Sequence, residues 1–320
     1  MKIETIQLNE KKPQVMLTAY LLDDSPEMLK GKVRPAVIIC PGGGYFSCSD
    51  REAEPVALQF AMMGYHAFVL KYTTYSEAGM GLPDLSKPLA VKEETLYPTQ
   101  IRELGEALLL IKKHAQEWKV DAKRIAVCGF SAGGHNAALY ATSWNKPVLT
   151  EFFDTAPEEL RPSCVILGYP LTDYVYLQKE IANKQNPMDA AFMKASNVAF
   201  LGKEEPGRAL LEMASPVYQV DEQTPPVFVW ATAADPLVSS THSLKLAEKL
   251  AENQVPYELH IFSEGGHGLS LATQASSEAA SQVNPAVSRW TELCGMWLEK
   301  YFELPLPEQT AIEQMQKKID

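Results

Sequence analysis

Short apolar runs alternate with amphipathic stretches along most of the chain. The run PAVIIC at 35–40 is wholly apolar, which is typical of a strand covered on both faces. Similar runs predict further strands at 66–72, 124–130, 163–168, 226–232 and 257–262. Apolar positions at helical spacing predict helices at about 53–63, 98–119, 132–144, 188–200, 239–253 and 286–302. This alternation favours a mostly parallel sheet with helices on both faces.

Two N-terminal stretches, 1–9 and 14–22, have the pattern of strands. We therefore predict an α/β fold in which helices flank a mostly parallel central sheet that begins with an antiparallel strand pair. Residues 1–320 are expected to form a single domain of this kind. The first helix carries a start signal, because Ser49 is followed three residues later by Glu52, as in a capping box.

Two long segments interrupt the alternation of strands and helices. They cover 73–97, which is rich in Gly, Pro and Ser, and about 171–214. Loops of this length in a compact domain are usually functional or disordered. We predict that both are insertions at the carboxyl edge of the sheet, where they would wall a ligand crevice; the alternative is solvated excursions without a role. The last stretch, 303–320, is either a docking helix or a frayed tail.

The charge balance narrows the range of partners. The 320 residues include 29 Lys and Arg against 40 Asp and Glu, a formal net charge of −11. This argues against a nucleic acid or an anionic membrane as partner, because both require a basic surface. No apolar run resembles a secretory signal or approaches the roughly 20 residues of a membrane span. The five cysteines form no CxxC pair. We expect a cytoplasmic protein with a small-molecule partner, and a homo-oligomer is compatible with the sequence.

A nucleophilic serine is indicated by GFSAG at 129–133, which fits the pattern G-x-S-x-G. An apolar strand runs into this motif and a helix of small residues leaves it, as in a nucleophile elbow. Such a turn holds Ser131 in a strained backbone conformation, with its hydroxyl exposed at the positive end of the helix dipole. Gly129 and Gly133 are predicted where strand and helix pass closely. The alternative is a tight structural turn.

A second glycine-rich loop, CPGGGY at 40–45, also follows a buried strand. Acyl transfer needs backbone N–H donors for the oxyanion of its tetrahedral intermediate, and each is worth on the order of 10²–10³ in rate. We predict that the N–H groups of Gly43, Gly44 and Ala132 form this oxyanion hole. A phosphate loop fits less well, since the GxxxxGK[ST] and GxGxxG patterns are missing. A glycine turn without function is the remaining alternative.

His267 is the histidine best placed to act as base for the serine. It lies in the glycine-flanked loop SEGGHGLS just after a predicted strand, from which an imidazole can reach over the sheet edge to Ser131. His135 competes with it, four residues past Ser131 on the same helix. That helix restricts how far its side chain can rise above the serine. A chain without a catalytic histidine is the third interpretation.

Asp235 is predicted to be the acid that orients this histidine. It ends the run VFVWATAAD and precedes His267 in the chain. Asp173, after the preceding strand, competes for the role, whereas Glu264 is too close in sequence to His267 to brace it. The order Ser131, Asp235, His267 is that of the α/β-hydrolase fold. The carboxylate would hold the imidazole tautomer and stabilise the imidazolium.

Aromatic residues at predicted strand ends, or in the loops after them, are candidates for lining an acyl or sugar pocket. The foremost are Tyr45, Tyr75 and Tyr169, although about half of such aromatics only pack in a core. The sequence has no HExxH or paired-histidine motif, so no catalytic metal is predicted.

The motifs GGGY, GFSAGGH, AAD and GGHG together resemble those of α/β-hydrolase esterases. The nearest group is the bacterial acetyl-esterase and acetyl-xylan-esterase-like carboxylesterases, relatives of the hormone-sensitive-lipase-like branch. The resemblance extends from about residue 35 to about residue 270 and implies hydrolysis of short-chain acyl esters without a cofactor. Two features depart from it. Pro41 stands where that branch usually has a histidine, and 73–97 has no obvious counterpart in compact members.

The motifs and the resemblance predict a serine carboxylesterase. Its substrates would be short-chain esters, above all acetyl esters, of small molecules that include carbohydrates. Two alternatives remain: a peptidase or amidase with the same triad, and a ligand-binding member of the fold without catalysis.

Overall fold

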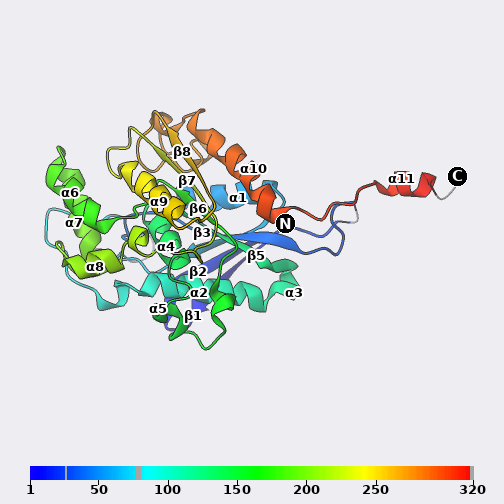
Figure 1. Ribbon diagram of the computed structural model, residues 1–320, viewed down its shortest axis with the longest axis horizontal. Coiled ribbons are helices and arrows are strands. Elements are labelled where there is room, and N and C mark those ends of the chain that lie inside the picture. Colours follow the sequence, from blue (N-terminus) through cyan, green and yellow to red (C-terminus); the bar gives the residue numbers. More distant parts are fainter. Residues whose placement is uncertain (26, 77–80, 318–320) are drawn as a thin grey trace.

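Eight strands form one sheet in the part of the chain that the computed structural model describes, residues 1–25, 27–76 and 81–317. Their order across the sheet is β1-β2-β4-β3-β5-β6-β7-β8 (Figure 1). The strands are β1 Lys2–Asn9, β2 Lys12–Leu21, β3 Arg34–Cys40, β4 His66–Lys71, β5 Val120–Phe130, β6 Val165–Gly168, β7 Val227–Thr232 and β8 Tyr257–Phe262.

The strands pair in two ways. β1 pairs with β2 and β2 pairs with β4 in antiparallel fashion, whereas the strands from β3 to β8 pair in parallel. This confirms the predicted α/β fold with its N-terminal antiparallel pair. Because the carboxyl ends of parallel strands lie at one edge of the sheet, the loops after β3, β5, β7 and β8 meet there.

Helices cover both faces of the sheet and create two hydrophobic cores. Successive side chains of β3 point to opposite faces: Ala36 and Ile38 belong to one core with residues of α2, α4 and α9, while Val37 and Ile39 belong to the other with residues of α1 and α10. The helices of the main body are α1 Glu54–Met62, α2 Thr99–Lys113, α3 Ala115–Trp118, α4 Ser131–Ala141, α5 Pro147–Thr150, α6 Tyr174–Asn183, α7 Pro187–Leu201, α8 Arg208–Met213, α9 Thr241–Glu252 and α10 Trp290–Phe302.

The start of α1 differs from the prediction. Ser49 makes no side-chain cap, a short 3-10 turn occupies Asp50–Glu52, and the α-helix begins at Glu54. The capping-box prediction was therefore wrong. The carboxylate of Glu52 turns inward and hydrogen-bonds elsewhere, because the packing beneath the turn offers it buried donors.

The two long segments adopt different structures. Residues 171–214 contain α6, α7 and α8, of which the sequence pattern predicted only α7. Figure 1 shows these three helices gathered at one end of the sheet. In the segment 73–97, the described residues form a single 3-10 turn at Glu93–Thr95. Residues 77–80 of that segment lie outside the described part of the chain.

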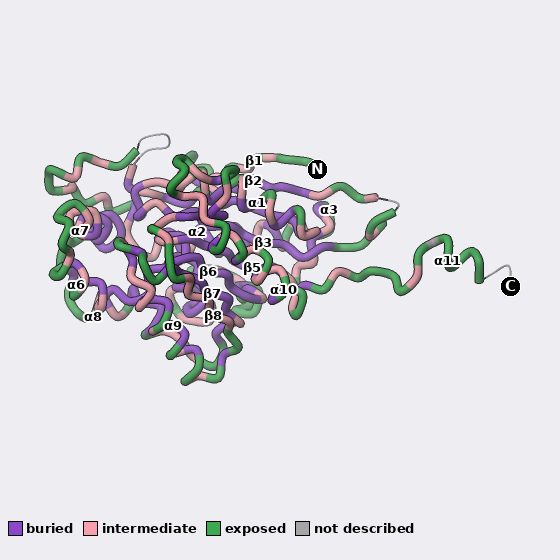
Figure 2. The backbone as a smooth tube through the Cα atoms, turned by 90° about the horizontal axis from the view of Figure 1, so that it is seen from above, coloured by how far each residue is buried: buried purple, intermediate pink, exposed green. Residues whose placement is uncertain are grey.

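The C-terminal stretch leaves the body of the molecule. Figure 2 shows it running outward beyond α10 as a largely exposed segment. It ends in the short helix α11, Ala311–Gln316, which Thr310 and Glu313 begin with a capping box. Among the helices described, none combines the length and apolar character needed to cross a membrane.

Candidate active site

The turn between β5 and α4 has the predicted elbow geometry. Phe130 is still extended, and Ser131 follows with a φ of 51°, a left-handed conformation that costs energy for a residue with a side chain. A Cβ on Gly129 would lie 2.2 Å from the carbonyl oxygen of Gly133, and one on Gly133 would lie 2.1 Å from that of Cys40. Only glycines allow strand and helix to approach this closely, and the approach presents the serine at the helix N-terminus.

The hydroxyl of Ser131 lies at one end of a chain of hydrogen bonds. Its Oγ is 2.7 Å from His267 Nε2, and His267 Nδ1 is 2.7 Å from Asp235 Oδ2. The other carboxylate oxygen of Asp235 accepts from the N–H groups of Leu237 and Val238, at 2.9 and 3.0 Å. The Asp235 side chain is 1% exposed and that of His267 is 14% exposed. With Nδ1 donating to the carboxylate, Nε2 is the nitrogen that accepts a proton from the serine.

The loop that carries His267 is held on both sides of the imidazole. The Thr232 hydroxyl, at the end of β7, donates to the carbonyl of Gly265 at 2.8 Å. The Arg51 guanidinium donates to the carbonyl of Gly268, also at 2.8 Å. The imidazole therefore reaches the serine from a loop that is anchored before and after it, although glycines flank it.

Neither of the other two candidate acids, Asp173 and Glu264, bonds to His267. Asp173 is the N-cap of α6, where its side chain accepts from the N–H of Tyr176, and it forms an ion pair with Lys245 of α9. Glu264 is exposed. The structure thus brings Asp235, and neither competitor, to the imidazole of His267.

The competing base, His135, is fully buried beside the serine. Its Nε2 lies 2.7 Å from the carbonyl oxygen of Ala214, to which it donates, and its Nδ1 accepts from the hydroxyl of Tyr45. Burial lowers the pKa of His135 to about 4, so the imidazole is neutral near pH 7. These two bonds join helix α4 to the glycine loop through Tyr45 and to the end of α8 through Ala214, so His135 has a structural role.

The predicted oxyanion loop has backbone N–H groups available. Gly43 adopts a φ of 133°, and a Cβ there would lie 2.1 Å from the carbonyl oxygen of Ser47. Its own carbonyl accepts from Phe46, which turns the Gly44 N–H to the opposite side of that peptide plane. Within the described chain the N–H groups of Gly43 and Gly44 have no protein acceptor. Ala132 lies in the first turn of α4, where N–H groups lack intrahelical partners.

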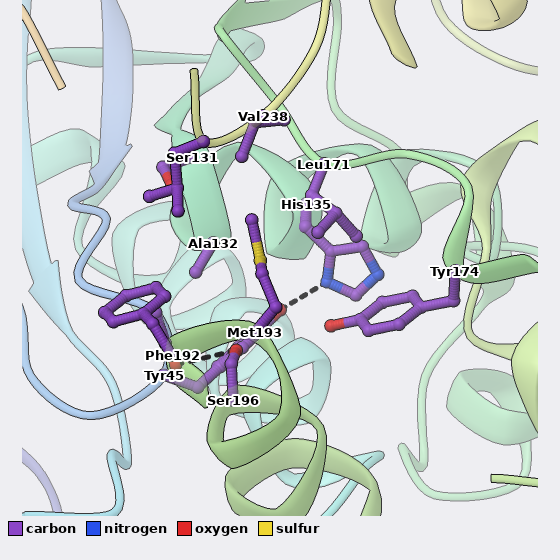
Figure 3. A pocket seen from close by; sticks show the side chains of 12 residues that line it. Tyr45, Ser131, Ala132, His135, Leu171, Tyr174, Phe192, Met193, Ser196 and Val238 are labelled. Atoms are coloured by element: carbon purple, nitrogen blue, oxygen red, sulfur yellow. Dashed lines mark hydrogen bonds between the residues drawn. The ribbon is translucent and has the colours of Figure 1, made fainter. Parts of the chain in front are cut away.

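A small cavity of about 20 Å³ opens beside the serine (Figure 3). It is lined by Gly44, Tyr45, Ser131, Ala132, His135, Leu171, Tyr174, Phe192, Met193, Ser196, Leu237 and Val238. The lining comes from the glycine loop, from the nucleophile helix, from the loop after Asp235, and from the segment 171–214. Most of the lining side chains are apolar, so the cavity suits an uncharged group.

Of the three tyrosines predicted to line a pocket, only Tyr45 lines this cavity. Tyr75 packs edge-on against Phe46 and donates to the carbonyl of Ala90, which places it behind the glycine loop. Tyr169 is 2% exposed, and its ring lies edge-on to that of His267 with 5.1 Å between the ring centroids. The prediction for Tyr75 and Tyr169 is therefore corrected: both are packed inside the fold.

Glu52 connects the two loops of the site and was missed by the sequence analysis. One carboxylate oxygen accepts from the N–H of Gly42 at 2.7 Å, and the other accepts from the hydroxyl of Tyr169 at 2.6 Å. That hydroxyl accepts in turn from the N–H of Ser270, three residues after His267, at 2.8 Å. Burial raises the pKa of the Glu52 carboxyl above its ordinary value, while the bonds from Tyr169 and Gly42 act in the opposite direction.

A signal for this inward position was present in the sequence. Glu52 precedes Val56 by four residues, and Val56 is fully buried. In a helix that continued back to residue 52, residues four apart would share a face, so this spacing indicates the buried side for Glu52. The sequence analysis interpreted Glu52 as the partner of Ser49 in a capping box and therefore did not use this spacing.

Comparisons with known proteins identify a family and several similar proteins. The BD-FAE family model matches residues 89–250, about half of the chain. Endo-1,4-beta-xylanase B of Butyrivibrio fibrisolvens is 30% identical over 80% of this chain and 35% of its own length. The carboxylesterase Cest-2923 of Lactobacillus plantarum WCFS1 has a TM-score of 0.72 and 28% identity, over 94% of this chain and 98% of that one.

A third similar protein is the acetyl ester-xyloside bifunctional hydrolase of Caldicellulosiruptor lactoaceticus. Its structure gives a TM-score of 0.70 and 30% identity, over 93% of this chain and 96% of that one. The chain spans between 35% and 58% of the length of the curated relatives it matches. In fold and sequence, the chain belongs to the BD-FAE family of α/β-hydrolase carboxylesterases.

Proposed function

We propose that the protein is a serine carboxylesterase that hydrolyses short-chain acyl esters, above all acetyl esters. The observation that carries this proposal is the chain of two 2.7 Å hydrogen bonds from Ser131 through His267 to Asp235, beside a small apolar cavity. A hydroxyl, an imidazole and a buried carboxylate in this arrangement are the groups that acyl transfer requires. Ser131, His267 and Asp235 are accordingly the proposed catalytic residues.

In the first half-reaction the Ser131 Oγ attacks the carbonyl carbon of the ester, and its proton passes to His267 Nε2. The Asp235 carboxylate stabilises the imidazolium and keeps its own charge, because the Leu237 and Val238 N–H groups also bind it. The negative charge that develops on the carbonyl oxygen would be met by the backbone N–H groups of the oxyanion loop and of the nucleophile helix.

The intermediate then collapses, the bond to the alcohol oxygen breaks, and the alcohol leaves with the proton held by His267. In the second half-reaction the imidazole takes a proton from water, and the resulting hydroxide attacks the acyl-enzyme. Collapse of this second intermediate releases the carboxylic acid and returns the proton to Ser131 Oγ. Each group thus ends as it began, and the net reaction consumes one ester and one water.

The substrate class rests on two supports. The cavity beside Ser131, about 20 Å³, favours a small acyl group. The relatives include an acetylxylan esterase of Xylanibacter ruminicola, and this supports a carbohydrate as the alcohol. All five cysteines are free, which supports a reducing compartment such as the cytoplasm as the location.

Turnover of p-nitrophenyl acetate by the wild type and by Ser131→Ala tests the proposal. Loss of the nucleophile is expected to lower kcat by at least about 10⁴-fold, since triad members act as a unit. The exposed Ser86→Ala variant is the matched control and should keep the wild-type rate. If wild type and Ser131→Ala release nitrophenol equally slowly, the proposal fails. Acetyl p-nitroanilide, assayed in parallel, identifies an amidase if its turnover exceeds that of the ester.

A further inference from the structure

The cavity beside Ser131 is small enough to limit what can occupy it. Its volume of about 20 Å³ is close to the space that one water-sized group requires. A methyl group fits such a space, whereas each further methylene of an acyl chain needs new room. The part of the lining that blocks this room decides which esters can bind.

Helix α7 forms the wall that faces the glycine loop. It contributes Phe192, Met193 and Ser196 to the lining. Two contacts fix its distance from the loop. The Ser196 hydroxyl donates to the carbonyl of Gly44 at 2.9 Å, and the Phe192 ring lies 2.6 Å from the position of a Cβ on Gly44. The helix therefore cannot move away from the loop without breaking a hydrogen bond and an apolar contact.

Met193 is the side chain that fills the remaining space. It is 2% exposed, and Figure 3 shows its thioether standing among the lining residues, between Ala132 and His135. Several other lining residues also form hydrogen bonds within the fold. Tyr45 donates to His135, and Ser196 donates to the carbonyl of Gly44. Met193 contributes an unbranched apolar chain whose length is its main property.

We infer that Met193 sets the acyl length that the site accepts and ends the acyl pocket near two carbons. This inference rests on the proposed esterase function and adds a specificity residue to it. Truncation of Met193 leaves the serine, the imidazole, the carboxylate and the N–H donors in place. It enlarges the cavity beside Ser131, which Met193 lines.

The test compares p-nitrophenyl acetate, butyrate and hexanoate as substrates of the wild type and of Met193→Ala. The wild type should favour acetate. The variant should raise the butyrate-to-acetate ratio of kcat/KM by at least about tenfold, because a methylene accommodated in an apolar pocket is worth 10-fold or more. Met188→Ala is the matched control, since Met188 lies on the same helix but is 63% exposed. Its ratio should equal that of the wild type.

The outcomes separate this inference from the function on which it rests. If the wild type hydrolyses no ester, the proposed function fails. If it hydrolyses acetate and butyrate equally well, or if the Met193→Ala ratio stays within about twofold of the wild-type value, the inference is overturned and the esterase proposal stands. Thermal unfolding verifies that the variant is folded. Met193→Val replaces it if it is not, and the same change of ratio, smaller in size, is then required.

Discussion

Ser131, Asp235 and His267 each follow a parallel strand of the sheet, whereas Leu171 and the lining residues of α7 belong to a helical segment inserted between β6 and β7. We call the first group the rim and the second group the wall. The rim rests on the parallel registers of β5 to β8 and on glycines that leave no room for a Cβ, and the Thr232 and Arg51 side chains add bonds to the loop of His267. The wall is held by side-chain packing and by a few hydrogen bonds.

Substitutions in the rim and substitutions in the wall should therefore affect the hydrolysis of esters in different ways. A change in the rim alters groups that meet the reacting atoms, so it should affect every ester alike. A change in the wall alters the space beside those atoms, so it should affect one ester more than another. The predicted response of Met193→Ala belongs to the second kind.

The largest effect is expected at the acid of the rim. Asp235→Asn removes the negative charge that stabilises the imidazolium, so kcat/KM should fall on the order of 10⁴-fold for acetate and butyrate alike. Asp173→Asn is the matched control. Its effect should be on stability, through the ion pair with Lys245, and not on the rate. Steady-state kinetics with both esters measure this, and the reverse ranking would transfer the acid role to Asp173.

A smaller effect is expected at Glu52, which joins the glycine loop to the loop that carries His267. In Glu52→Gln the amide can accept only on one side, so the Gly42 N–H or the Tyr169 hydroxyl loses its buried acceptor. Such a loss costs about 1–3 kcal/mol, which corresponds to roughly a 10- to 100-fold fall in kcat if the oxyanion loop and the His267 loop shift.

The matched partner for Glu52→Gln is Tyr169→Phe, which removes the same bond from its other end. The two single variants and the double variant form a cycle. We expect the double variant to be little worse than the poorer single one, with KM nearly constant throughout. Effects on kcat that simply add would show that Glu52 and Tyr169 do not act through one connection.

The smallest effect on activity is expected far from the rim, at His66. This residue begins β4, at the opposite edge of the sheet, and accepts from the N–H of Leu22. Burial, together with the Arg34 charge, lowers its pKa to about 4. Between pH 6.5 and 4, His66 is protonated in the unfolded chain but not in the folded chain. Stability is therefore lost as the pH falls.

The measurement is the free energy of unfolding in urea at several pH values, for the wild type and for His66→Gln. The difference between the two proteins should change by about 1.4 kcal/mol per pH unit below pH 6.5 and remain constant above it. Ester hydrolysis at pH 7 should be unchanged in the variant. A difference that does not depend on pH would mean that His66 titrates normally in the folded protein.

The sequence by itself determined the eight strands, most of the longer helices and the residues of the rim. The elbow at GFSAG is a local feature, because strand, turn and helix are adjacent in the chain and glycines mark the close contacts. Asp235 and His267 could be placed because each follows an apolar run, and parallel strands end at one edge of the sheet. The fold class followed from the same alternation.

Only the tertiary structure decided which residues form the wall and how Glu52 and Tyr169 connect the glycine loop to the loop that carries His267. It also decided which of the three predicted tyrosines line the cavity. The spacing from Glu52 to Val56 indicates an inward position, but Gly42 and Tyr169, the partners of its carboxylate, come from distant segments that no local pattern identifies. Tyr169 became a packed support, and Met193 became a wall residue, through the docking of loops and helices against one another. Burial of a polar group or the closing of a cavity depends on several segments at once, whereas periodicity describes one segment at a time.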